Sequence, residues 1–97
     1  MGSVKIQFAN VSDILRTDLG KGDLIITNTR KSLTSMKTDY QNAIGIYTTI
    51  VGTASKYLDM AKALGDENMI GRLSKDIKDA NEMIKISNTA INKLSAV

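Results

Sequence analysis

Residues 43–54 read AIGIYTTIVGTA, a stretch without charge in which two glycines lie seven residues apart. The uncharged run extends from Tyr40 to Ser55 and is shorter than the ~20 predominantly apolar residues that span a bilayer. A strand would require strict alternation of apolar and polar residues, whereas apolar residues here recur every three or four positions. The stretch therefore predicts the buried middle of a long helix, and no membrane span is expected.

The apolar spacing of this stretch continues in both directions along the chain. Alternating steps of four and three residues connect positions that are nearly all apolar: Leu15, Leu19, Gly22, Ile26, Thr29, Leu33, Met36, Tyr40, Ala43, Tyr47, Ile50, Ala54, Tyr57, Ala61 and Leu64. A second row with the same stepping follows: Ile70, Leu73, Ile77, Ala80, Ile84, Ser87, Ile91 and Leu94. Such repeats are typical of long helices that pack side by side.

Between the two rows lies a stop and start signal, Leu64-Gly65-Asp66. Gly65 suits the left-handed position that follows a helix, and Asp66 suits the N-cap of the next helix. The sequence therefore predicts an all-α fold, an antiparallel hairpin of residues 23–64 and 67–95 that turns at Gly65 and Asp66, in a single domain of residues 1–97.

The N-terminal part is less regular. Residues 4–8 alternate apolar and polar side chains, which predicts a strand-like lead-in. A short helix is expected over residues 11–19. Gly20 and Gly22 weaken a helix by about 1 kcal/mol each relative to alanine, so we expect a break or flexible joint there, although a continuous helix stays an alternative.

Composition excludes several classes of function. The chain has no Cys and no His, which excludes the usual zinc ligand sets, thiol nucleophiles and imidazole bases. Asp76 and Asp79 are expected to be solvated charges on a polar helix face. The net charge of +3 comes without a basic run longer than Arg30-Lys31, so no nucleic-acid partner is expected. We expect no cofactor, no metal and no enzymatic activity.

Helix lengths point to a protein partner. A helix over residues 23–64 would be ~60 Å long and one over 67–94 only ~42 Å, so the longer arm would extend beyond the shorter one with an uncovered apolar seam. Gly45 and Gly52 share a face that would let another helix approach closely. Phe8 is either a cap on the core or an anchor for another chain. The predicted intermolecular contacts are Phe8, Leu15, Leu19, Ile26, Leu33, Met36, Gly45 and Gly52.

The architecture resembles the small helical-hairpin proteins of type VII secretion, the Trp-x-Gly superfamily. In addition, Val4-Lys5-Ile6-Gln7-Phe8 with Val11 is similar to the start of small proteins encoded beside LXG-domain toxins. The chain has no Trp and no Tyr-x-x-x-Asp/Glu export signal. The resemblance therefore implies an accessory subunit that binds the helical N-terminal domain of a toxin and helps present it to the secretion machinery.

These observations predict a non-enzymatic helical binding protein, an accessory, targeting or chaperone-like partner of an LXG toxin. The alternatives are a self-assembling structural protein that uses the same seam for homo-oligomers, and a small antitoxin or immunity protein. The first twenty residues lack the apolar run of a signal peptide. The expected location is the cytoplasm, with export, if any, by a route that does not read such a signal.

Overall fold

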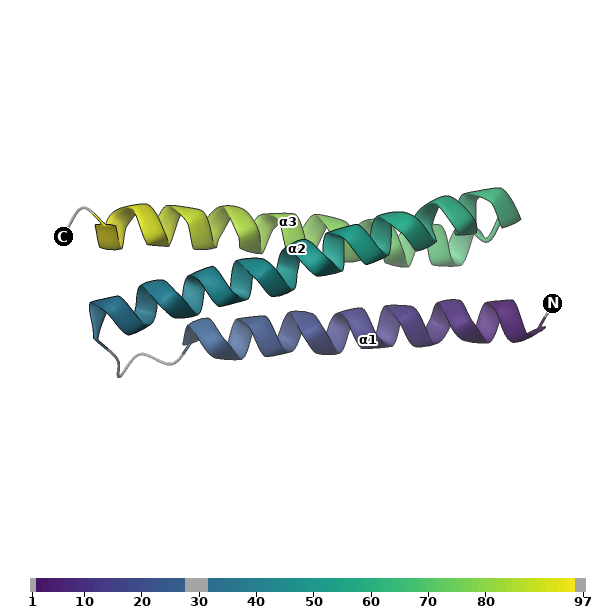
Figure 1. The fold of residues 1–97 in the computed structure, drawn as a ribbon. Coiled ribbons are helices and arrows are strands. Elements are labelled where there is room, and N and C mark those ends of the chain that lie inside the picture. Colours follow the sequence, from purple (N-terminus) through teal and green to yellow (C-terminus); the bar gives the residue numbers. More distant parts are fainter. Residues whose placement is uncertain (1, 28–31, 96–97) are drawn as a thin grey trace.

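The computed structural model describes the backbone of residues 2–27 and 32–95 and the side chains of residues 11–27 and 32–95. The described residues form three helices and no strand: α1 (Gly2–Thr27), α2 (Leu33–Leu64) and α3 (Glu67–Ser95). Helix α2 runs antiparallel to both of the others, so α1 and α3 run in the same direction (Figure 1). The molecule is a rod of 53 × 19 × 14 Å.

The hairpin of α2 and α3 and its turn are confirmed. Gly65 has a left-handed backbone with φ 70° and ends α2. The Gly65 N–H donates to the Lys62 carbonyl at 3.2 Å, and the Asp66 N–H donates to the Ala61 carbonyl at 3.0 Å. The Asp66 carboxylate accepts a hydrogen bond from the Met69 N–H at 3.2 Å and so caps α3. These bonds are all local, which is why short-range signals suffice to place the turn.

We expect Gly65→Val to lower the free energy of unfolding by more than about 1 kcal/mol, because a β-branched residue is strained at positive φ. Urea denaturation followed by circular dichroism measures this loss. Gly65→Asn is the control, since Asn tolerates the left-handed region, and it should lose clearly less. Equal stability of all three proteins would contradict the turn geometry.

The expected strand-like lead-in and the expected break at Gly20 and Gly22 are wrong, because α1 is one continuous helix. Residues 4–8 are helical, not strand-like; an alternation of five residues is short, and Val4, Phe8, Val11 and Leu15 also fit helical spacing. The helix expected over residues 11–19 is present and forms the middle of this longer element.

The glycines do not break α1 because packing outweighs local propensity. The Tyr47 ring of α2 lies against Gly22 so closely that a Cβ there would stand 2.8 Å from two ring carbons. Helix α1 therefore continues to Thr27, and α2 begins at Leu33 rather than at residue 23, with Ser32 as its N-cap. The Ser32 hydroxyl accepts a hydrogen bond from the Ser35 N–H at 3.2 Å.

The core lies along α2, which packs most extensively against α3 and then against α1; the contact between α1 and α3 is the smallest. Alanines on α2 and α3 let the helix backbones approach, and the ring of Tyr47 fills the space between α1 and α2. The buried apolar residues are Leu15, Leu19, Ala43, Tyr47, Ile50, Ala54, Ala61, Met69, Leu73 and Ala80.

Candidate functional site

Helix α1 occupies much of the seam that was expected to receive a partner. Leu15 and Leu19 are only 3% and 6% exposed and belong to the core. These two side chains were predicted to make intermolecular contacts, and the structure places them instead in the internal packing of the bundle. The physical reason is the length of α1, which lies along α2 as far as Thr27 and covers the apolar side that a short helix would leave open.

Three of the other predicted contact residues, Ile26, Met36 and Leu33, are partly accessible to solvent. Ile26 and Met36 are half-buried, and Ile26 packs against the core. Leu33, in the first turn of α2, is 50% exposed. Phe8 lies in α1, but its side chain is outside the described residues.

Gly45 and Gly52 are both exposed on α2. A Cβ built on either glycine would meet no atom within 4 Å, in contrast to Gly22. Gly45 also borders an open groove of about 410 Å³ between α1 and α2, which we call the α1/α2 groove. Its lining residues are Asp18, Lys21, Asn42, Gly45, Ile46 and Thr49.

The accessible face of α2 around these glycines carries no charge. Every residue from Tyr40 to Ser55 is uncharged, and the exposed ones are small or polar: Gln41, Asn42, Gly45, Thr48, Thr49, Gly52 and Ser55. On α1, Ile14 is 58% exposed. Charge at the groove itself is limited to Asp18 and Lys21, which pair with each other at 3.9 Å. The surface is thus nearly neutral and open to another helix.

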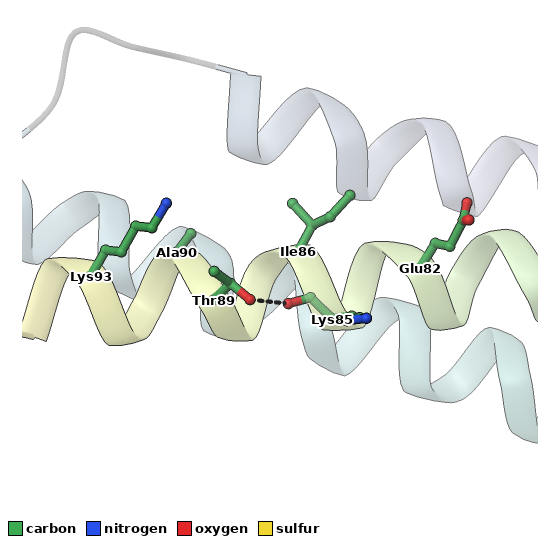
Figure 2. Close-up of a pocket in the computed structure, with 6 residues that line it drawn as sticks. All are labelled: Glu82, Lys85, Ile86, Thr89, Ala90 and Lys93. Carbon is green, nitrogen blue, oxygen red and sulfur yellow. Dashed lines mark hydrogen bonds between the residues drawn. The ribbon is translucent and has the colours of Figure 1, made fainter.

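A second open groove, of about 620 Å³, lies on α3; we call it the α3 groove. It is lined by Glu82, Lys85, Ile86, Thr89, Ala90 and Lys93. Figure 2 shows Glu82, Ile86, Ala90 and Lys93 extending from the same side of α3. Ile86 is 54% exposed, so the α3 groove has an accessible apolar side chain between the charged residues Glu82, Lys85 and Lys93.

Between α1 and α3 lies an ionic cluster that the sequence did not predict. Arg16 Nε lies 2.7 Å from Asp76 Oδ1, and Arg16 Nη1 lies 2.8 Å from Asp79 Oδ2. The Ser12 hydroxyl donates to Asp76 Oδ2 at 3.3 Å. Asp76 is fully buried, which corrects the expectation of a solvated charge; Asp79 is half-buried and also paired.

Burial raises the pKa of Asp76 above its ordinary value, while the Arg16 guanidinium and the Ser12 hydroxyl hold it down. Its ion pairs and hydrogen bond all join α1 to α3, so the physical effect of the cluster is to fix these two helices against each other. A signal was present in the sequence, since Asp76 lies three residues after Leu73 and four before Ala80. The neighbouring Ile77 is apolar and also fits the spacing of the row, so the sequence pattern selected Ile77 instead of Asp76 as the inward-facing residue.

A second polar contact joins α1 to α2. The hydroxyl of the buried Tyr47 donates a hydrogen bond to Asp23. Burial and the nearby Asp23 carboxylate both raise the pKa of Tyr47, so the hydroxyl keeps its proton. Helix α1 is therefore held at two separate points, by α3 near Arg16 and by α2 near Asp23.

None of the helices in the described part of the chain combines the length and the apolar character needed to cross a membrane. Among these same residues, no group of three or more Asp and Glu side chains could hold a metal ion. Comparison with protein-family models, with curated proteins and with solved structures gives no match.

Proposed function

We propose that this chain is a non-enzymatic helical binding protein that docks a helix of a protein partner. The observation that carries the proposal is the α1/α2 groove together with the uncharged outer face of α2 that borders it. A long amphipathic helix is the ligand that such a groove between two helices fits.

The glycines give the physical argument. A glycine inside a helix lowers helix stability by about 1 kcal/mol relative to alanine. At Gly22 the space left by the missing side chain is filled by Tyr47, so the chain itself uses it. At Gly45 and Gly52 the same space is empty. Small residues let a second helix approach to the short end of the usual interaxial distance of 8–10 Å, which gives these two glycines a use.

The resemblance to accessory proteins of LXG toxins supports the choice of partner. In this proposal the groove binds the helical N-terminal domain of such a toxin and shields its apolar face before export. In this proposal the complex forms in the cytoplasm and is then delivered to the type VII machinery. The chain then acts as an accessory, targeting or chaperone-like subunit.

The test is binding of the recombinant N-terminal helical domain of the LXG toxin that this proposal expects in the neighbouring gene. We expect Gly45→Leu combined with Gly52→Leu to weaken this binding at least about tenfold, because the added side chains fill the space that the toxin helix needs. The free energy of unfolding of the isolated variant should stay equal or rise slightly, since leucine is a better helix former and meets no atom there.

Gly71→Leu is the matched control. Gly71 is an exposed glycine inside α3, likewise without neighbours within 4 Å, and it lies outside both grooves. Its substitution should leave toxin binding unchanged. Equal binding by all three proteins, or no binding of the toxin domain by the wild type in isothermal titration calorimetry, would refute the proposal.

A further inference from the structure

Helix α3 carries a second row of residues beside its buried one. Glu82, Ile86, Thr89 and Lys93 follow one another in steps of four, three and four, the spacing of a helix-packing seam. All four are exposed and all four line the α3 groove. The buried row of α3 is separate and consists of Met69, Leu73, Asp76, Ala80 and Ser87. The outer row thus has the spacing of a packing surface, and its four side chains are exposed in the part of the chain that the structure describes.

The order of the side chains in this row is self-complementary. The acid, Glu82, and the base, Lys93, stand at its two ends, and Ile86 and Thr89 stand between them. If a second α3 is laid antiparallel over the first, about a two-fold axis between residues 87 and 88, each Glu82 faces Lys93 of the other copy. Each Ile86 then faces Thr89 of the other copy and lies beside its Ala90. Both ends of the contact therefore pair opposite charges at once.

A parallel arrangement would lack this property. Two parallel copies in register would place Glu82 against Glu82 and Lys93 against Lys93, and like charges face to face oppose association. A two-fold axis perpendicular to α3 generates the antiparallel arrangement, with the same patch on both subunits.

The groove is open where this contact would form. Arg16 ties α1 to α3 at Asp76 and Asp79, on the N-terminal side of the row. Farther along α3, the exposed Ile86 and Lys93 and the half-buried Ala90 line the groove, and Figure 2 shows the C-terminal end of α1 above the side to which Glu82 and Ile86 point.

We propose that the α3 groove is the interface of a symmetric, antiparallel homodimer, in which two copies exchange Glu82–Lys93 ion pairs around a centre of Ile86 side chains. This surface is distinct from the α1/α2 groove, so the inference goes beyond the function proposed above. Because the contact is short and its ion pairs are exposed, we expect weak and salt-sensitive association, with a dissociation constant of about 10–100 µM.

The test is sedimentation equilibrium of the full chain at concentrations up to about 300 µM, three times or more the expected dissociation constant. Glu82→Lys and Lys93→Glu should each weaken self-association at least about tenfold, because each variant sets two like-charge pairs face to face. An equimolar mixture of the two variants should associate as tightly as the wild type, within about threefold, because a mixed dimer has opposite charges at both ends.

Glu67→Lys is the control, an exposed acid in the first turn of α3, and it should dimerise like the wild type. Circular dichroism checks that every variant keeps its helices. A wild type that stays monomeric over this range overturns the proposal. So does self-association that both single variants retain, or a mixture that stays as weak as its components. The variant with leucine at positions 45 and 52 should dimerise normally, so a failure of toxin binding and a failure of dimerisation are separate results.

Discussion

Replacing Arg16 with methionine should lower the free energy of unfolding by about 3 kcal/mol at neutral pH, although the Arg16 side chain is 42% exposed. Methionine keeps most of the aliphatic stem and removes the guanidinium. Asp76 is then left fully buried with the Ser12 hydroxyl at 3.3 Å and with the negative Asp79 nearby. Breaking a buried ion pair from one side is costly because the remaining charge stays buried without an opposite charge beside it. Urea denaturation followed by circular dichroism measures the loss.

The control for this prediction is Arg72→Met. Arg72 is an exposed arginine that lines the same surface around Asp76, and its loss should change stability by less than about 0.5 kcal/mol. Adding Asp76→Asn to Arg16→Met should recover at least half of the loss, since the buried charge is then gone. A loss below about 1 kcal/mol for Arg16→Met, or no recovery in the double variant, would contradict the buried ion pair.

The same pair gives a dependence on pH whose sign is fixed by the raised pKa of Asp76. A raised pKa means that the folded chain binds the proton more tightly than the unfolded chain. Protonation of Asp76 therefore stabilises the folded state as the pH falls through the raised pKa towards the ordinary pKa of an aspartate. Without the Arg16 charge the pKa of Asp76 rises further, so Asp76 takes up its proton at a higher pH in Arg16→Met than in the wild type. The difference in the free energy of unfolding between Arg16→Met and the wild type should therefore shrink as the pH is lowered from 8 to 5.

A feature could be predicted from the sequence when the residues that determine it lie close together along the chain. The hairpin turn needs a left-handed glycine at Gly65 and a cap at Asp66, both within a few residues of each other, and both are in the expected places. The inward face of α3 depends on α1 instead. An apolar pattern selects Ile77 over Asp76, and only Arg16, sixty residues away in the chain, makes a buried carboxylate acceptable there.

The candidate site follows the same rule. The exposure of Gly45 and Gly52 could be expected from their offset to the apolar seam, and the structure places both on the surface. The burial of Leu15 and Leu19 could not be expected from the sequence, because it depends on how far α1 extends along α2. Local propensity ends that helix near Gly20, whereas the contact of Gly22 with Tyr47 continues it.

This contact supplies a prediction in which two neighbouring glycines respond in opposite directions. Gly22→Ala should lower the free energy of unfolding by about 1–3 kcal/mol, even though alanine is the better helix former by about 1 kcal/mol. The new Cβ would stand 2.8 Å from two carbons of the Tyr47 ring and 3.0 Å from its hydroxyl oxygen. The ring cannot turn aside easily, because it is fully buried and its hydroxyl is bonded to Asp23. Helix α1 must therefore move away from α2.

Gly20→Ala is the matched control, two residues away in the same helix. A Cβ at Gly20 meets no atom within 4 Å, so this variant should be more stable than the wild type by about 0.5–1 kcal/mol. Thermal and urea unfolding of both variants give the two signs. Gly22→Ala introduced together with Tyr47→Leu should lose less than Gly22→Ala does in the wild-type chain, because the shorter side chain leaves room for the new methyl group. If both alanines instead stabilise α1 equally, helix propensity alone governs this segment, and the close approach of Tyr47 to α1 is not what keeps the helix continuous through Gly22.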